Sequence, residues 1–246
     1  MAGVFRAVFR RFARHRSTCS MAPSGTSSTE DALRSSKRAM RRQVNESLRS
    51  TPPASLLAAG ERAALRLMET PTFREARVIA LYVSSQRLRE VPTRDVIARA
   101  LEERKHVYLP HIGDGKGGPN SMRMLRVTDV AEVAPPAGSM ELEEPPLTCA
   151  DGSRRPDLED ADALPLDLVV CPGVAFDAAG GRLGRGGGFY DAFLGRMRAR
   201  TTELDRAAPR TIGLCVDAQV VDRVPRDDHD FVVNELVTES RAILTL

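Results

Sequence analysis

The sequence contains no tryptophan, and only 4% of its 246 residues are aromatic. Proteins that hold single-stranded nucleic acids combine a basic groove with aromatic rings on which the bases stack. The formal net charge is only +3, and five arginines with no acidic neighbour lie within the first 16 residues. The rest of the chain is near neutral, so no nucleic-acid partner is expected.

Long apolar runs and paired cysteines are also absent. No stretch is long and apolar enough to cross a bilayer, so no membrane partner is expected. The four cysteines (Cys19, Cys149, Cys171 and Cys215) form no CxxC pair, which gives no support to a zinc site or a disulfide framework. Cys171 and Cys215 lie in apolar, strand-like runs, where buried and inert thiols are expected.

Acidic residues are missing from the N-terminal segment, where the first one is Glu30. Phenylalanines and arginines recur there at helical spacing on different faces. An amphipathic start that is rich in Arg and Ser is typical of a mitochondrial transit peptide. A basic tail without a targeting role is the alternative, and Met21 could begin a cytosolic form. We expect a leader over residues 1–28 and one domain over residues 29–246, located in the mitochondrial matrix.

Glycine is concentrated in one stretch, from Phe176 to Asp191, which reads FDAAGGRLGRGGGFYD. A strand-like run, 166–170, precedes it and a helix-like segment follows. Glycines between a strand and a helix leave backbone amides free for an anion, and Arg182 and Arg185 can add charged contacts. A turn alone needs only one or two glycines, whereas this stretch has six. Because the spacing is neither that of the P-loop nor that of the dinucleotide fingerprint, it predicts a phosphate loop of another kind.

The remaining pattern alternates between helices and strands. We expect helices over 29–49, 55–68 and 92–105, and strands over 76–84, 106–110, 121–127, 166–170 and 211–216, with a closing strand at the C-terminus. The polar, proline-rich stretch 128–165 is expected to be a long loop. This order predicts an α/β fold with three layers, α/β/α, around a mostly parallel central sheet.

Charged residues near the two ends of the predicted domain suggest further contacts. Lys37 and Arg41 lie four residues apart, so they share one side of a helix and could reach a single polyphosphate, although such clusters are usually solvated faces. Asp227, Asp228, His229 and Asp230 form either a solvated loop or part of a magnesium site in which Asp191 or Asp230 supplies a carboxylate. His106, His111 and His229 are interpreted as structural.

These motifs together resemble one enzyme family. The segment DLVVCPGVAFDAAGGRLGRGGGFYDAFL resembles the signature region of the 5-formyltetrahydrofolate cyclo-ligases, also called methenyltetrahydrofolate synthetases. The likeness extends to the Lys37–Arg41 start, the VSSQRLREVPT segment, LPHI and the VPRDDHDFVVNELVT tail. It implies ATP-dependent conversion of 5-formyltetrahydrofolate to 5,10-methenyltetrahydrofolate, ADP and phosphate, with Mg²⁺. We expect a monomer whose partners are small molecules.

The resemblance also assigns residues. It implies that Arg185 and Tyr190 are catalytic, that folate meets Val83, Glu90 and Arg185 to Phe189, and that Mg²⁺ binds Asp191 and Asp230. The implied ATP contacts are Lys37, Arg38, Arg41, Arg182, Leu183, Gly184, Arg185, Gly186, Gly187, Gly188, Phe189 and Tyr190.

Two departures from the family pattern are visible. Some members carry lysine where this chain has Gly187, and the residues Arg87-Leu88-Arg89 are inserted before Glu90. Two other functions stay open at this stage. The chain could be a catalytically silent relative that binds folate, a nucleotide or RNA, or an ATP-dependent ligase or kinase that acts on another small acid.

Overall fold

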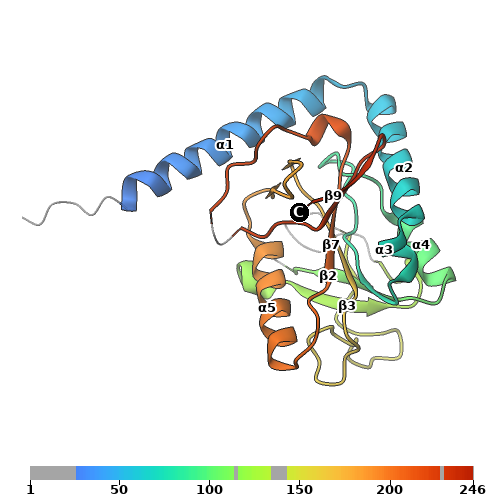
Figure 1. Cartoon of the computed structure of the whole chain (residues 1–246). Coiled ribbons are helices and arrows are strands. Elements are labelled where there is room, and N and C mark those ends of the chain that lie inside the picture. Colours follow the sequence, from blue (N-terminus) through green and yellow to red (C-terminus); the bar gives the residue numbers. More distant parts are fainter. Residues whose placement is uncertain (1–25, 114–115, 134–142, 228–229, 246) are drawn as a thin grey trace, which may run out of the picture.

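A seven-stranded sheet forms the middle layer of the computed structural model, which describes residues 26–113, 116–133, 143–227 and 230–245 (Figure 1). The strand order is β3-β2-β1-β4-β7-β8-β9. The five central strands run parallel, and β3 and β9 pair antiparallel at the two edges. The strands are β1 (Val78–Ala80), β2 (His106–His111), β3 (Arg123–Val127), β4 (Leu168–Cys171), β7 (Arg210–Leu214), β8 (Glu235–Val237) and β9 (Ala242–Leu244). The predicted mostly parallel sheet is confirmed.

Helices cover both faces of this sheet. They are α1 (Thr26–Ser50), α2 (Pro53–Glu69), α3 (Pro71–Glu75), α4 (Arg94–Glu102) and α5 (Phe189–Glu203), with short 3₁₀ helices η1 (Pro119–Ser121), η2 (Val130–Glu132) and η3 (Asp217–Gln219). Alternate strand residues point to opposite faces, so Val170 joins the core with α2 and α4, whereas Val169 joins the core with α5. Figure 1 shows α5 on the opposite side of the sheet from α2 and α4. The three-layer prediction is therefore confirmed.

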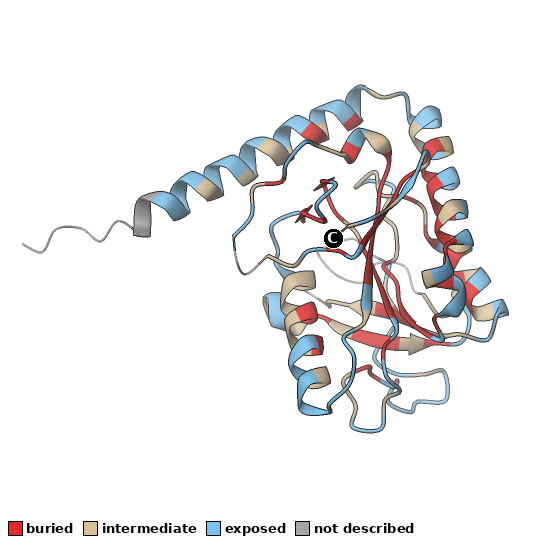
Figure 2. Ribbon diagram, viewed as in Figure 1, coloured by how far each residue is buried: buried red, intermediate tan, exposed pale blue. Residues whose placement is uncertain are grey.

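Helix α1 packs on the body through its middle and C-terminal turns. Val44 and Leu48 are buried there, whereas the first turns are exposed and extend away from the body (Figure 2). Lys37 and Arg41 lie where the helix meets the body. The predicted leader over residues 1–28 and the alternative start at Met21 fall almost wholly outside the described residues. No helix in the described part of the chain is both long and apolar enough to cross a membrane.

Three expected elements differ in the structure. The strand expected over 76–84 ends at Ala80. Leu81 still donates to the Tyr108 carbonyl oxygen of β2. Beyond Leu81, the Thr93 hydroxyl bonds the chain, because its Oγ1 donates to the Tyr82 carbonyl oxygen and accepts from the Ser84 amide. The loop expected over 128–165 contains η2, and its residues 134–142 lie outside the described part. The C-terminus forms two strands, β8 and β9, in place of one closing strand.

A small two-stranded ribbon lies between β4 and the glycines that precede α5, and it contains the first part of the glycine stretch. Strands β5 (Ala175–Phe176) and β6 (Arg182–Leu183) pair antiparallel, apart from the main sheet. The strand-like run 166–170 thus precedes the glycine stretch, as the sequence indicates, but this ribbon lies between β4 and the loop before α5. The ribbon intervenes because Ala175, Phe176 and Leu183 are apolar and buried, which gives the turn between them an anchor in the core.

Candidate active site

The six glycines fall into two groups with different roles. Gly180 and Gly181 form the turn between β5 and β6, where the buried Asp177 accepts hydrogen bonds from the amides of Gly181 (2.8 Å), Ala179 (3.0 Å) and Val224 (2.7 Å). Gly180 has φ +79°, and a Cβ there would lie 2.4 Å from the Val233 carbonyl oxygen. These two glycines therefore meet a mechanical need, and only the other four exceed what a turn requires.

The other four glycines form an exposed loop from Gly184 to Gly188, which leads directly into α5. Gly188 precedes the first helical residue and no side chain caps this helix, so its first amides face outward without a protein side-chain partner in the described structure. Unpaired amides and the helix dipole favour an anion at this place. We call Gly184 to Gly188, with the first turn of α5, the anion loop.

Helix α1 lies against the anion loop through Arg41. The Arg41 Nε donates to the Gly184 carbonyl oxygen over 2.7 Å, and its guanidinium lies close to Gly186. Desolvation lowers the pKa of Arg41 from its ordinary value; Asp230 opposes this shift and Arg38 adds to it. Arginine still keeps its charge at neutral pH, so the loop gains a cation from a segment far away in the sequence.

Lys37 approaches the same region from one helical turn earlier. Its Nζ lies 2.5 Å from Asp230 Oδ2 and 3.3 Å from Asp227 Oδ2, and its side chain is 15% exposed. Arg38, in contrast, is exposed, and its Nε contacts only its own helix at the Arg34 carbonyl oxygen. The structure thus brings Lys37 and Arg41 to the loop and leaves Arg38 on the outer face of α1. Asp228 and His229 lie outside the described residues.

Arg182 lies beneath the anion loop. Its side chain is 3% exposed, its Nη2 donates to Asp191 Oδ1 over 2.7 Å, and a second nitrogen contacts the Pro172 carbonyl oxygen. The guanidinium carbon lies 5.8 Å from the centre of the Tyr190 ring. Leu183 is buried as well, so its side chain belongs to the core. The buried guanidinium thus holds the carboxylate of Asp191 at the start of α5.

The Tyr190 hydroxyl is buried and has no hydrogen-bond partner in the described part of the structure. Burial raises the pKa of Tyr190 well above its ordinary value, and Cys171 and Glu90 add to the shift. Burial likewise raises the pKa of the Cys171 thiol to about 12. Both groups therefore stay protonated at neutral pH, which excludes a thiolate nucleophile at Cys171 and leaves Tyr190 as a hydrogen-bond donor.

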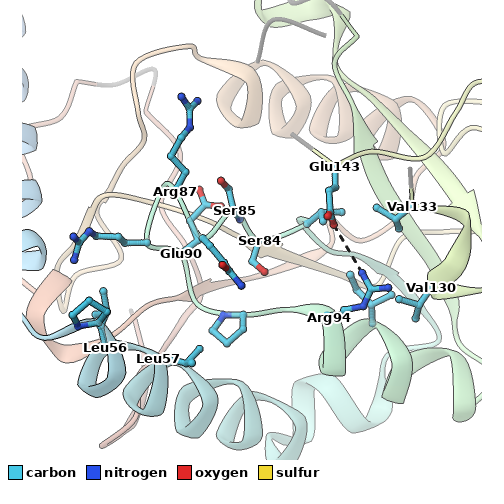
Figure 3. Close-up of a pocket in the computed structure, with 16 residues that line it drawn as sticks. Leu56, Leu57, Ser84, Ser85, Arg87, Glu90, Arg94, Val130, Val133 and Glu143 are labelled. Carbon is cyan, nitrogen blue, oxygen red and sulfur yellow. Dashed lines mark hydrogen bonds and ion pairs between the residues drawn. The ribbon is translucent and has the colours of Figure 1, made fainter. Parts of the chain in front are cut away.

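A cavity of about 900 Å³ adjoins the anion loop. Arg185 connects the two, because its Nε lies 3.3 Å from Glu90 Oε1 and its Nη2 donates to the Leu88 carbonyl oxygen. Glu90 also accepts from the Ser85 amide over 3.0 Å. Four parts of the fold line the cavity (Figure 3): Pro53, Leu56 and Leu57 of α2; residues 83–87, Arg89, Glu90 and Pro92; Arg94 and Ile97 of α4; and Val130, Val133 and Glu143. Two predicted folate contacts, Val83 and Glu90, are thus wall residues.

The predicted metal ligands lie at separate places around the loop. Asp191 is in the first turn of α5, and Asp230 is in the tail next to Lys37. Within the described residues, no three His, Cys, Asp or Glu side chains cluster closely enough to hold a metal by themselves. Mg²⁺ is commonly bound by one or two carboxylates together with substrate phosphates, so two carboxylates do not conflict with such a site.

Several residues of this region are absent from the sequence-based predictions. Asp177 could have been found, since an aspartate that opens a glycine turn commonly bonds the amides that follow it. Gln219 holds the segment before β5 through the carbonyl oxygens of Gly173 and Val174, and Arg94 and Glu143 line the cavity. No local pattern predicts these three, because their partners come from other parts of the chain.

Comparison with known proteins identifies the family to which the chain belongs. The model of the 5-formyltetrahydrofolate cyclo-ligase family matches residues 33–239, which is most of the chain. The chain belongs to the 5-formyltetrahydrofolate cyclo-ligase family. The mitochondrial 5-formyltetrahydrofolate cyclo-ligase of Arabidopsis thaliana is 31% identical over 97% of this chain and 87% of its own length. The Escherichia coli K12 cyclo-ligase is 28% identical over 80% of this chain and 97% of its own length.

A solved structure of a related protein has the same fold. The NMR structure of the Aquifex aeolicus 5,10-methenyltetrahydrofolate synthetase aligns with a TM-score of 0.62 and 27% identity, covering 85% of this chain and 92% of the other. The Mycoplasma pneumoniae 5,10-methenyltetrahydrofolate synthetase aligns with a TM-score of 0.57 at 16% identity, which supports the fold alone. The matched region of the cyclo-ligase family includes the anion loop, α1 from Leu33 onward and the tail with Asp230.

Proposed function

We propose that this chain is a 5-formyltetrahydrofolate cyclo-ligase, which uses ATP to close 5-formyltetrahydrofolate to 5,10-methenyltetrahydrofolate and releases ADP and phosphate. The observation that carries this proposal is the contact between Arg185 and Glu90, which joins an anion loop to a large cavity. One substrate with a transferable phosphate and another with an extended organic body would meet at this contact. Membership in the family supplies the identity of both.

The chemistry follows from the poor leaving ability of a formamide oxygen. The formyl oxygen attacks the γ-phosphorus, and the bond to ADP breaks. The neighbouring amine nitrogen then attacks the activated carbon and loses its proton, and the carbon–oxygen bond breaks so that phosphate leaves with the formyl oxygen. Such a reaction depends on the positioning of both substrates and on neutralisation of charge rather than on a protein nucleophile. The protonated Cys171 thiol is consistent with that requirement.

The residues around the anion loop have different roles in this reaction. The free amides of the anion loop and the cations Lys37 and Arg41 bind the phosphates of ATP. Arg185 lies at the boundary with the cavity, where it stabilises charge on the transferring phosphoryl group. Tyr190 donates a hydrogen bond from a hydroxyl for which the described protein groups offer no acceptor. Val83 and Glu90 contact the folate from the cavity wall.

A magnesium ion fits the carboxylates at this site. Asp191 has one oxygen held by Arg182, and its second oxygen has no partner among the described residues. Asp230 likewise engages Lys37 and the Asp227 amide through Oδ2 alone. We infer that these two carboxylates hold Mg²⁺ together with the phosphates of ATP. When bound, Mg²⁺ neutralises phosphate charge.

Location and domain organisation belong to the same proposal. We infer that residues 1–28 direct the protein to mitochondria and that residues 29–246 form one domain. The acid-free, arginine-rich composition of the leader and the mitochondrial relative from Arabidopsis thaliana support this inference. The protein is proposed to act as a monomer on small molecules, without nucleic acid.

The test is direct mixing of the protein with Mg-ATP and 5-formyltetrahydrofolate. We expect the absorbance band of the methenyl product to rise as ADP is released in equal amount, and to stay flat when ATP is omitted. Binding of the folate without any rise would identify a silent relative. Release of ADP with another small acid, but not with the folate, would identify a different ligase.

A further inference from the structure

The cavity has two ends with different chemistry. At one end Glu90 meets Arg185 of the anion loop, where the proposed reaction places the reacting atoms. At the other end Arg94 and Glu143 face each other beside Val130 and Val133, on the far side of the cavity from Leu56 (Figure 3). A substrate whose reactive ring lies at the Glu90 end therefore extends its remaining length toward Arg94.

The volume allows such an extended substrate. Pockets for small organic ligands measure about 300–1,000 Å³. This cavity, at about 900 Å³, is near the upper limit, so it has room for more than a fused ring. Leu56, Leu57, Ile97, Val130 and Val133 give it apolar walls between the two ends.

Arg94 is held only weakly by the protein. Its Nη1 lies 3.9 Å from Glu143 Oε2, which is beyond hydrogen-bond length, and the two side chains are 65% and 48% exposed. In the described structure neither side chain has another hydrogen-bond or ion-pair partner. An exposed pair of this kind contributes little to stability, so an incoming carboxylate can replace Glu143 at small cost and form two parallel hydrogen bonds with the guanidinium.

The backbone around Arg94 also favours an anion. Arg94 is the first residue of α4, and the residue before it, Thr93, does not cap the helix, because its hydroxyl is engaged with Tyr82 and Ser84. The partial positive charge of the helix start adds to the charge of the guanidinium, and Asp95 in the same turn offsets part of it.

We propose that Arg94 binds the carboxylate tail of the substrate, a glutamyl group or a short chain of γ-linked glutamates on the folate. Glu143 occupies this position in the absence of substrate and competes with the tail. The inference rests on the proposed cyclo-ligase function, because that function supplies the folate. Arg94 is a specificity residue and does not touch the reacting atoms.

The experiment compares two substrates in the parent protein and in three variants. The substrates are 5-formyltetrahydrofolate with three γ-linked glutamates and the corresponding formyl compound without any glutamate. Arg94→Gln should raise KM for the glutamylated substrate about tenfold, as expected for the loss of a charge-assisted contact, with the loss in KM rather than in kcat. KM for the tail-less compound should not change.

The matched control is Arg99→Gln. Arg99 belongs to the same helix, is 56% exposed and pairs with Glu103 over 2.7 Å, but it does not line the cavity. This variant should keep the preference of the parent protein. Glu143→Gln should lower KM for the glutamylated substrate, because it removes the competing carboxylate.

If Arg94→Gln changes KM equally for both substrates, or changes it for neither, the role of Arg94 is wrong. Turnover of the folate by the parent protein would still support the cyclo-ligase function. If the parent turns over neither compound, the proposed function fails, and equilibrium titration of the same two compounds still decides the question. A selective loss of glutamylated-folate binding in Arg94→Gln then supports the subsite. Equal binding to parent and variant, or no binding to the parent, refutes it.

Discussion

Residues 177–183 and residues 184–190 are adjacent, and each contains glycines and one arginine, yet the structure uses them in opposite ways. The first segment is largely buried, and its polar groups bond to one another: Asp177 accepts from three amides and Arg182 pairs with Asp191. The second segment is largely exposed, its helix start has no side-chain cap, and Arg185 reaches across to Glu90. The difference shows that a buried turn, whose polar groups bond within the protein, supports an exposed loop whose backbone amides remain available to a ligand.

Removal of Asp177 should have the largest effect on stability. Asp177→Ala leaves three amides, two of them buried, without an acceptor, so we expect the free energy of unfolding to fall by about 3–5 kcal/mol. Chemical denaturation of parent and variant measures this loss. Asp177→Asn keeps one oxygen acceptor and should lie between them. A fall below about 1 kcal/mol would mean that the turn does not depend on this carboxylate.

Removal of Arg185 should lower activity strongly and change stability only slightly. Arg185→Ala should raise the barrier of the cyclisation by roughly 2–4 kcal/mol, the scale for one preorganised donor, because Arg185 faces the transferring group. Stability should change by less than about 1 kcal/mol, because its pair with Glu90 is partly exposed. Turnover measured by the methenyl band and denaturation measured on the same sample test both parts. Turnover within threefold of the parent value would refute the assigned role.

Two glycine substitutions compare the segments with the smallest change in chemistry. Gly180→Ala places a Cβ 2.4 Å from the Val233 carbonyl oxygen at φ +79°, so we expect a loss of about 2–4 kcal/mol in stability. Gly186→Ala has φ +106° but its closest new contact is 3.7 Å from the Arg41 guanidinium, so only the backbone cost of about 1–2 kcal/mol applies. Thermal unfolding of the two variants should rank them in this order. The reverse order would show that the exposed loop, not the turn, is the constrained segment.

The residues around Gly187 bear on the lysine that some family members carry at this position. A Cβ at this position would lie 2.8 Å from the Phe189 ring, so the lysine of some family members requires that this ring move. In this chain Arg41 approaches the neighbouring Gly184 and Gly186. A cation is therefore present at the loop without a side chain at position 187.

Much of the fold and part of the site followed from local patterns. The apolar run over 166–170 predicted a buried strand, which the structure shows as β4, and helical spacing predicted α1, α2 and α4, because periodicity reports which face of an element is buried. The glycine stretch and its arginines predicted an anion loop, since the chemistry of a helix start is local. The likeness of the same residues to the cyclo-ligase family is confirmed.

Only the tertiary structure decided which of these residues work together. Arg182 and Arg185 are three positions apart, but one is buried against Asp191 and the other meets Glu90, 95 positions away. Lys37 finds its carboxylate partner 193 positions later, and the cavity is assembled from four separate segments. Spacing along a chain specifies the face of a helix or strand, whereas partners and cavities depend on how faces from distant segments pack against one another.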